Sequence, residues 1–541
     1  MLRRVTRAVV AAAAALALVL GYQLPAAAAY VPVNGAGSTW SENAIRQWAS
    51  NVQQYGMRID YAGTGSTDGR NQFASGLTDF GVSEIPYGKD DNAAAEARPK
   101  FPFAYMPIVA GGTAFMYNLK IGANKVTNLR LSGDTLAKIF TNVITVWNDP
   151  AIKQDNPGLA LPARKIVPVV RSDGSGTTAQ FTTWLSNQYP SIWNAYCAKA
   201  GRKTPCGITS IYPTIPGSAT TAQSGSQSVA GYVAQDAGLG AITYVEYSYA
   251  LYAHFPVAKI RNKSDYYIEP TAQSVAVALL AAKINTNKSS PDYLTQDLRG
   301  VYAYGDPRTY PLSSYSYMLL PVDQENTRFK KAKGKTLGDF SYYFLCEGQQ
   351  QADKLGYSPL PINLVQAGLD QVRRIPGVDA QNVNIKKCNN PTFSTDGTNT
   401  LAKKAPQPKA CDKVGPTQCT TGTAGATSDT PTTGTKNNNT SKPTSTATRG
   451  PNPTASSSSA AAGGAATGGD TGGAIDPDTG QVVGGAGGGG VDSVSAIPVS
   501  LSNQLDPTLK LVLIIVACGL LLGLTVGPPL IARMLNRGDR R

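Results

Sequence analysis

Three short clusters in this sequence combine glycine with hydroxyl side chains. They occupy residues 35–40 (Gly-Ala-Gly-Ser-Thr-Trp), 63–67 (Gly-Thr-Gly-Ser-Thr) and 171–178 (Arg-Ser-Asp-Gly-Ser-Gly-Thr-Thr). Each follows a predicted strand and opens a predicted helix, whose N-terminus offers unpaired N–H groups and a positive partial charge. Glycine permits close approach, and the hydroxyl groups add donors. With one arginine, the three clusters predict a cradle for a small tetrahedral oxyanion.

A purely structural interpretation competes with this one for the first two clusters. Serine and threonine at a helix start are most often N-caps, and residues 63–69 lack the spacing of a dinucleotide-binding glycine loop. The third cluster is more specific. Arg171 is followed two residues later by Asp173, which can lock the guanidinium for two-point binding of an oxyanion.

The elements that must position these clusters follow an α/β pattern from about residue 31 to residue 377. One helix is predicted from apolar residues at helical spacing, and a second with Phe73 and Leu77 facing inward. The apolar positions of the first helix are Ala44, Ile45, Trp48, Ala49, Val52 and Tyr55. Strands are predicted at residues 58–62, 80–83, 165–170, 239–244 and 317–322. No repeat is present.

Common catalytic signatures are missing from this chain. The only histidine is His254, and there is no Gly-x-Ser-x-Gly elbow, Walker A loop or two-histidine metal helix. Ser175, as a phosphatase-like nucleophile, has no base or metal ligand beside it in the sequence. Zinc is disfavoured because no Cys-x-x-Cys pair occurs. The sequence therefore predicts a protein that is not an enzyme and holds no metal or cofactor.

A fourth segment, residues 79–86 (Asp-Phe-Gly-Val-Ser-Glu-Ile-Pro), completes an ordered set. In this order, the four segments resemble the phosphate-binding proteins (PstS type) of phosphate ABC transporters, over roughly residues 33–375. Residues 147–149, 156–159, 240–247 and 310–314 match that family as well. The resemblance implies an α/β, two-lobed periplasmic-binding-protein-like (type 2) fold with a hinge and the ligand between the lobes. Lobe 1 would comprise residues 30–107 and 311–376, and lobe 2 residues 108–310.

The resemblance also implies a set of ligand contacts. Thr39, Ser66, Ser175 and Thr177 would contribute side chains, Trp40 and Gly176 backbone N–H groups, and Arg171 its positive charge, while Asp173 would orient Arg171. The departure is Glu84, where the family has aspartate. In the family that carboxylate accepts a phosphate proton and repels sulfate, which has none to donate. Because glutamate is one methylene longer, arsenate or a phosphonate remain alternatives to phosphate.

Both ends of the chain carry targeting signals. Residues 1–29 are Arg-rich, then apolar, then small, as in a secretory signal peptide. Residues 511–532 contain no charge and are long enough to span a bilayer, and the basic tail 533–541 indicates a cytoplasmic C-terminus. Between them we expect a Cys-containing extension (377–419) and a disordered Ser/Thr/Gly/Pro/Ala-rich stalk (420–508). The body would then be extracellular, on a single-pass membrane anchor.

The cysteines fit an oxidising compartment. Pairing of sequence neighbours is favoured among the six outside the predicted membrane helix, although other connectivities remain open. The favoured pairs are Cys197 with Cys206, Cys346 with Cys388, and Cys411 with Cys419.

The formal net charge of +14 does not indicate a nucleic-acid partner, because part of it lies at the two termini and the rest is spread thinly. The expected function is a membrane-tethered extracellular protein that captures inorganic phosphate and delivers it to a membrane ABC permease. A phosphate or oxyanion sensor, or a surface-display protein not coupled to transport, is the alternative.

Overall fold

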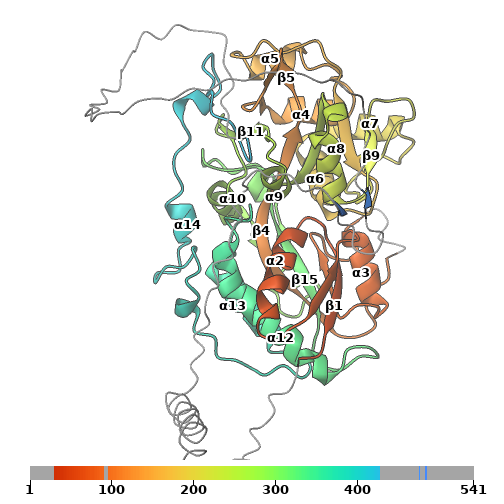
Figure 1. The fold of residues 1–541 in the computed structure, drawn as a ribbon, viewed down its shortest axis with the longest axis vertical. Coiled ribbons are helices and arrows are strands. Elements are labelled where there is room, and N and C mark those ends of the chain that lie inside the picture. Colours follow the sequence, from red (N-terminus) through yellow and green to blue (C-terminus); the bar gives the residue numbers. More distant parts are fainter. Residues whose placement is uncertain (1–29, 91–95, 427–473, 476–481, 484–541) are drawn as a thin grey trace, which may run out of the picture. The chain divides into compact units, whose positions relative to one another are not determined.

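The centre of the protein, in the part of the chain that the structure describes, is a mixed eight-stranded β-sheet (Figure 1). The structure is a computed structural model, and it describes residues 30–90, 96–426, 474–475 and 482–483. In spatial order the strands are β2 (Ile59–Ala62), β1 (Val33–Gly37), β3 (Phe80–Ser83), β15 (Ser313–Pro321), β4 (Phe103–Tyr117), β10 (Ala241–Glu246), β8 (Val167–Arg171) and β9 (Thr221–Gln223). The strands predicted from the sequence are present as β2, β3, β8, β10 and β15; β3 has the predicted ends, and the ends of the others differ by at most four residues.

Strand β4 connects two parts of this sheet. Its residues 103–112 pair antiparallel with β15, and its residues 113–117 pair antiparallel with β10. We call β2, β1, β3 and β15 the first half of the sheet, and β10, β8 and β9 the second half. Within the first half β1, β2 and β3 are parallel, and within the second half β8, β9 and β10 are parallel.

Helices cover both halves of the sheet (Figure 1). In the first predicted helix, now α2, Trp48 and Val52 are fully buried. In the second, α3, Phe73 is buried, but Leu77 lies beyond the end of the helix and is 53% exposed, so its predicted inward orientation is wrong. Helix α3 ends at Ala74, and Gly76, in the left-handed region at φ +71°, turns the chain away before Leu77.

The described helices are α2 (Glu42–Gln53), α3 (Ser66–Ala74), α4 (Gly133–Phe140), α5 (Pro150–Asp155), α6 (Gly176–Gln188), α7 (Pro190–Lys199), α8 (Gly225–Ala234), α9 (Tyr247–Tyr252), α10 (Ala272–Ala278), α11 (Arg299–Tyr302), α12 (Lys331–Leu345), α13 (Ile362–Val372) and α14 (Thr400–Lys403). Short 3-10 helices occupy Asp236–Gly238, Leu279–Ala281, Glu347–Gln351, Ile385–Cys388 and Ala410–Asp412. Smaller sheets contain β12 (Tyr267–Ile268), β11 (Lys259–Arg261) and β7 (Arg130–Leu131), then β13 (Lys283–Ile284) with β14 (Gln296–Asp297), and β5 (Lys120–Ile121) with β6 (Asn124–Lys125).

The chain divides into two units, residues 1–439 and 440–541. In the second unit the structure describes one antiparallel pair, β16 (Ala474–Ile475) with β17 (Val482–Val483). The predicted signal peptide, membrane helix and basic tail, and most of the predicted stalk, lie outside the described residues. Among the described residues, no helix combines the length and the apolar composition needed to cross a membrane.

The three neighbour pairs of cysteines form disulfides, Cys197–Cys206, Cys346–Cys388 and Cys411–Cys419. We call residues 377–426 the extension. The Cys411–Cys419 disulfide lies within it, and the Cys346–Cys388 disulfide joins it to the end of α12. The extension runs alongside both halves of the sheet (Figure 1). Thr392 Oγ1 donates to Leu360 O beside α13, and Arg308 Nη1 donates to Ala402 O near α10. Packed chain continues to Ala426, past the predicted start of the stalk at residue 420.

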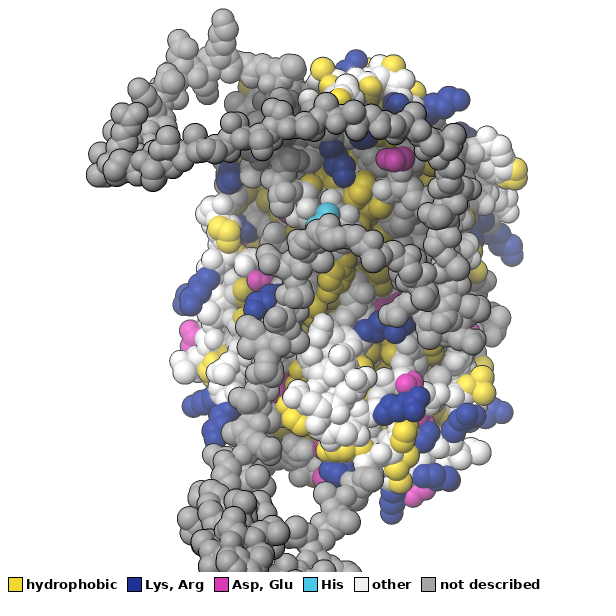
Figure 2. Space-filling view, in the orientation of Figure 1, with side chains coloured by type: hydrophobic (Ala, Val, Ile, Leu, Met, Phe, Trp, Pro, Cys, Tyr) yellow, Lys and Arg dark blue, Asp and Glu magenta, His cyan; other side chains and the backbone are white. Residues whose placement is uncertain are grey.

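Surface charge is distributed rather than concentrated on the face shown in Figure 2. Lys and Arg side chains lie around the described surface there without forming one patch, and Asp and Glu side chains lie among them.

Candidate functional site

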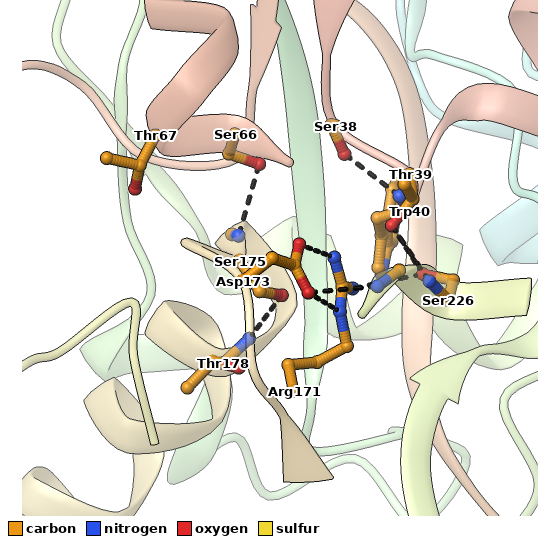
Figure 3. Close-up of polar contacts among 12 residues, drawn as sticks. Ser38, Thr39, Trp40, Ser66, Thr67, Arg171, Asp173, Ser175, Thr178 and Ser226 are labelled. Atoms are coloured by element: carbon orange, nitrogen blue, oxygen red, sulfur yellow. Dashed lines mark hydrogen bonds and ion pairs between the residues drawn. The ribbon is translucent and has the colours of Figure 1, made fainter. Parts of the chain in front are cut away.

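The carboxyl ends of strands from both halves of the sheet meet at one cluster of polar residues (Figure 3). In the first half, β1 leads to Thr39 and Trp40, β2 to Ser66, and β3 to Glu84. In the second half, β8 ends at Arg171, and α6 begins at Gly176. Ligand sites of open α/β sheets lie outside the carboxyl ends of the strands, so this cluster is the candidate site.

The turn after β1 is held close to β3. Ser38 N donates to Val82 O at 2.9 Å, and a Cβ added to Gly37 would lie 2.2 Å from the same oxygen, so position 37 accepts only glycine. Ser38 Oγ accepts from Trp40 N at 3.0 Å. Thr39 O accepts from Tyr249 OH of α9 at 2.5 Å, which connects this turn to the second half.

The first turns of α3 and α6 contact each other across the two halves. Ser66 Oγ accepts from Gly176 N at 3.1 Å and donates to Glu84 Oε2 at 2.7 Å. Nearby, Thr67 N donates to Gly174 O at 3.0 Å. These bonds place the second and third predicted clusters against one another, beside the Glu84 carboxyl.

Glu84 is buried and surrounded by serine hydroxyl groups. Its Oε1 accepts from Ser38 Oγ at 2.5 Å and from Ser316 Oγ of β15 at 2.9 Å, in addition to the bond from Ser66 to Oε2. Burial raises the pKa of the Glu84 carboxyl above its ordinary value, and the hydroxyl donors offset part of that rise. Glutamate therefore fits this position with every carboxylate oxygen bonded.

Arg171 and Asp173 form a two-point ion pair. Arg171 Nε donates to Asp173 Oδ1 at 2.7 Å, and Arg171 Nη2 contacts Asp173 Oδ2. The Arg171 side chain is 2% exposed, so its charge is shielded from water. Burial acts to raise the pKa of Asp173, but the hydrogen bonds and charge of Arg171 outweigh it and hold that pKa below its ordinary value. The locking contact expected from the sequence is present.

The two remaining predicted side chains, Ser175 and Thr177, behave differently. Ser175 is the N-cap of α6, and its Oγ accepts from Thr178 N at 3.2 Å, which is the structural role that serine often has at a helix start. Thr177 is 1% exposed, and its Oγ1 has no hydrogen-bond partner among the described residues. A buried hydroxyl of this kind costs stability unless something binds it.

The structure adds three serines that the sequence interpretation missed. The hydroxyl groups of Ser38 and Ser316 donate to Glu84. The third serine is Ser226, in the first turn of α8, whose Oγ lies 2.8 Å from Thr39 Oγ1 and accepts from Arg171 Nη1 at 3.2 Å. Ser226 had a usable signal. Residues 223–226 (Gln-Ser-Gly-Ser) follow a strand and open a helix, as the three recognised clusters do.

The predicted residues thus come together in one place. Hydrogen bonds connect Thr39 to Ser226 and Arg171, and connect Trp40 through Ser38 to Glu84, Ser66 and Gly176. Ser175 and Thr177 flank Gly176 in the chain. The arrangement offers hydroxyl groups, helix N–H groups, one arginine and one carboxyl, which together suit a partly protonated tetrahedral anion.

Comparison with known proteins gives a consistent result. Residues 23–347 match the PBP superfamily domain. The phosphate-binding protein PstS of Methanocaldococcus jannaschii is 31% identical over 344 residues, which cover 63% of this chain and 85% of that protein. Phosphate-binding protein PstS 3 of Mycobacterium tuberculosis is 31% identical over 340 residues, covering 61% and 82%. A crystal structure of the ancestral soluble variant of the human phosphate binding protein aligns with a TM-score of 0.48 at 20% identity, covering 66% of this chain and 98% of that one.

Proposed function

Because this chain belongs to the PstS-type family of phosphate-binding proteins, we propose that it binds inorganic phosphate at the polar cluster around Arg171. Proteins of this family are substrate-binding components of phosphate ABC transport and not enzymes. One observation carries the proposal. Gly176 N of the second half donates to Ser66 Oγ of the first half at 3.1 Å, close to the Arg171 guanidinium that Asp173 holds in place.

The proposed ligand contacts are the side chains of Thr39, Ser66, Glu84, Arg171, Ser175 and Thr177 and the N–H groups of Trp40 and Gly176, with Asp173 orienting Arg171. Several of these donors have a protein partner in the structure: Trp40 N bonds Ser38, and Gly176 N bonds Ser66. Binding would exchange those partners for ligand oxygens. Thr177 has no partner to give up among the described residues, which makes its hydroxyl the readiest donor.

Glu84 is proposed to accept a proton from the bound anion. Its buried carboxylate faces hydroxyl groups, and no cation contacts it directly among the described residues. The negative charge of Glu84 would therefore repel an oxyanion that has no proton to donate. Discrimination of this kind reaches about 10⁴ to 10⁵ when a buried polar group loses its bond. Phosphate is therefore favoured over sulfate, and arsenate shares the chemistry that phosphate presents.

We further propose two lobes, residues 30–107 with 311–376 and residues 108–310, that close on the ligand about a hinge. The support is the change of partner along β4 at residues 112–113, from β15 to β10. This boundary lies within a few residues of the proposed lobe boundary at 107–108. Lobe closure around a ligand is a common hinge motion.

Delivery to an ABC permease by a protein tethered through residues 511–532 completes the proposal. The family supports the permease partner, and the sequence alone supports the tether. A sensor that uses the same site is the second candidate. Phosphate uptake measured in cells that lack other phosphate-binding proteins separates the two: uptake that depends on this chain supports transport, and uptake that is unchanged by its deletion supports sensing.

Equilibrium dialysis of the full chain with labelled phosphate tests binding itself. We expect saturable binding that excess sulfate does not displace and that Arg171→Met abolishes. The matched control is Arg299→Met, because Arg299 pairs with Asp297 through a side chain that is 75% exposed. Absence of saturable binding, or full displacement by sulfate, would contradict the proposed function.

A further inference from the structure

The first turn of α8 contributes contacts that connect both halves of the sheet at the site. Ser226 is fully buried, and its Oγ lies 2.8 Å from Thr39 Oγ1 while accepting from Arg171 Nη1 at 3.2 Å. Its backbone N also donates to Thr39 Oγ1 at 3.1 Å. Figure 3 shows Ser226 beside Arg171 and Thr39. One residue thus contacts a ligand residue of each half.

The neighbouring residue acts on the same ion pair. Gly225 N donates to Asp173 Oδ1 at 2.9 Å, the oxygen that also accepts from Arg171 Nε. Gly225 has φ +77°, in the left-handed region that favours glycine, and this conformation directs its N–H at the carboxylate. Residues 225 and 226 therefore hold the Arg171 guanidinium at two of its nitrogens. Gly225 acts through Asp173, which accepts from Nε, and Ser226 accepts directly from Nη1.

Ser226 and Thr39 come from distant parts of the sheet. Thr39 follows β1 of the first half, whereas Ser226 follows β9 at the edge of the second half. Their hydroxyl contact exists only while the two halves are this close together. A hydroxyl suits this position because it can accept from a guanidinium and still share a proton with a second hydroxyl.

We infer that Ser226 is a positioning residue for the ligand, which holds Arg171 and Thr39 together in the closed arrangement and so slows ligand release. The inference rests on the proposed phosphate site. Without the Ser226 hydroxyl, Arg171 Nη1 loses its one protein acceptor among the described contacts, and the Thr39 hydroxyl keeps only the backbone N–H of residue 226. The effect should fall on dissociation, because the contact forms after the halves have approached each other.

The test is stopped-flow kinetics of phosphate binding by the full chain. We expect Ser226→Ala to raise the dissociation rate constant about tenfold, as is typical for loss of one hydrogen bond to a charged group, and to change the association rate constant by less than about twofold. Ser228→Ala is the matched control, because Ser228 is an exposed serine on the same helix. The thermal midpoint without phosphate reports whether each variant is folded.

A second variant covers the case in which Ser226→Ala does not fold. Ser226→Cys keeps nearly the same volume with a weaker donor and acceptor, and it should raise the dissociation rate constant in the same direction. Equal dissociation rates for the wild-type chain and a folded variant would overturn the inference and leave the proposed function intact. No saturable phosphate binding by the wild-type chain would overturn the proposed function, and this inference with it.

Discussion

Glu84 and Gly176 approach each other so closely that residue 176 has no room for a side chain. A Cβ added to Gly176 would lie 1.9 Å from Glu84 Oε2 and 2.5 Å from Ser66 Oγ. The N-terminus of α6, the hydroxyl of Ser66 and the buried carboxyl are therefore in direct van der Waals contact. A change in any one of them must displace the others.

Gly176→Ala should weaken phosphate binding by about tenfold or more, because displacing the start of α6 removes the Gly176 N–H, a proposed donor to the charged ligand. Overpacking at this contact should also destabilise the fold by about 1–3 kcal/mol. Isothermal titration calorimetry measures the change. Gly231→Ala on α8 is the control, since a Cβ there meets nothing within 4 Å. That control should leave affinity unchanged and stabilise the fold by about 0.5–1 kcal/mol. Unaltered affinity in Gly176→Ala would show that the ligand binds away from α6.

Thr177→Val should separate binding from folding. The Thr177 hydroxyl is buried without a partner among the described residues, so its removal should raise the free energy of unfolding by about 1 kcal/mol. Phosphate affinity should fall by about tenfold or more, because a donor to a charged ligand is lost. Denaturant unfolding and calorimetry measure the two quantities.

Thr178→Val gives the contrast for that experiment. Thr178 Oγ1 is bonded to Tyr244 OH at 2.8 Å, so this substitution should lower stability. If Thr177→Val instead lowers stability and leaves affinity intact, the Thr177 hydroxyl is not a ligand donor.

The stability of the fold should decrease as pH rises above about 4.5. Burial raises the pKa of Glu246 well above its ordinary value of 4.5, and burial also raises that of Glu84. Above pH 4.5 the unfolded chain releases protons that the folded chain retains, so the free energy of unfolding falls until pH passes the raised pKa values. Glu246→Gln, which keeps an acceptor for Ser248 N, should flatten the part of this slope that Glu246 causes.

Thermal midpoints of the wild type and Glu246→Gln between pH 4.5 and 8 check this. The variant should be the more stable at pH 8, and the two curves should converge toward pH 4.5. Asp297→Asn is the control, because the hydrogen bonds of Arg299 lower the pKa of Asp297 and its contribution is lost only below about pH 3.8. Parallel curves for the wild type and Glu246→Gln would mean that Glu246 titrates normally.

The Cys411–Cys419 disulfide should contribute more to the free energy of unfolding than the Cys197–Cys206 disulfide. The two close loops of similar length, with sequence separations of 8 and 9. The Cys411 loop provides two carbonyl acceptors, Cys411 O and Thr417 O, for the buried guanidinium of Arg130 at 3.0 Å. Burial lowers the pKa of Arg130 but leaves it charged, so loss of those acceptors would leave N–H donors of a buried cation without partners.

Replacing both cysteines of each pair by serine in the full chain tests this prediction. Loss of loop closure alone should lower the free energy of unfolding by about 2–4 kcal/mol for either pair. For the Cys411–Cys419 pair, loss of the Arg130 acceptors should lower it by about 1–3 kcal/mol more. Denaturant unfolding compares the two double variants. Equal decreases in the free energy of unfolding for the two double variants would show that Arg130 binds other acceptors when the 411–419 disulfide is absent.

Local patterns in the sequence predicted the strand-to-helix turns, because glycine spacing and helix periodicity act over a few residues. They therefore placed Thr39, Ser66 and Gly176 at the ends of the correct elements. Ser316 could not be found in this way, since its relation to Glu84 spans 232 residues and depends on β15 pairing with β3. Leu77 was predicted to face inward because the periodicity continued past Ala74, whereas the turn at Gly76 ended it.

The extension carries a consequence for motion. It is hydrogen-bonded at Thr392 to Leu360, in the proposed lobe of residues 30–107 and 311–376, and at Ala402 to Arg308, in the proposed lobe of residues 108–310. Ala402 follows Thr392 by ten positions along the chain, and a fully stretched chain covers at most about 3.6 Å per position. Thr392 and Ala402 can therefore be at most roughly 36 Å apart while both hydrogen bonds remain intact. The extension thus runs parallel to the sheet (Figure 1) and would set an outer limit on how far the two proposed lobes could open.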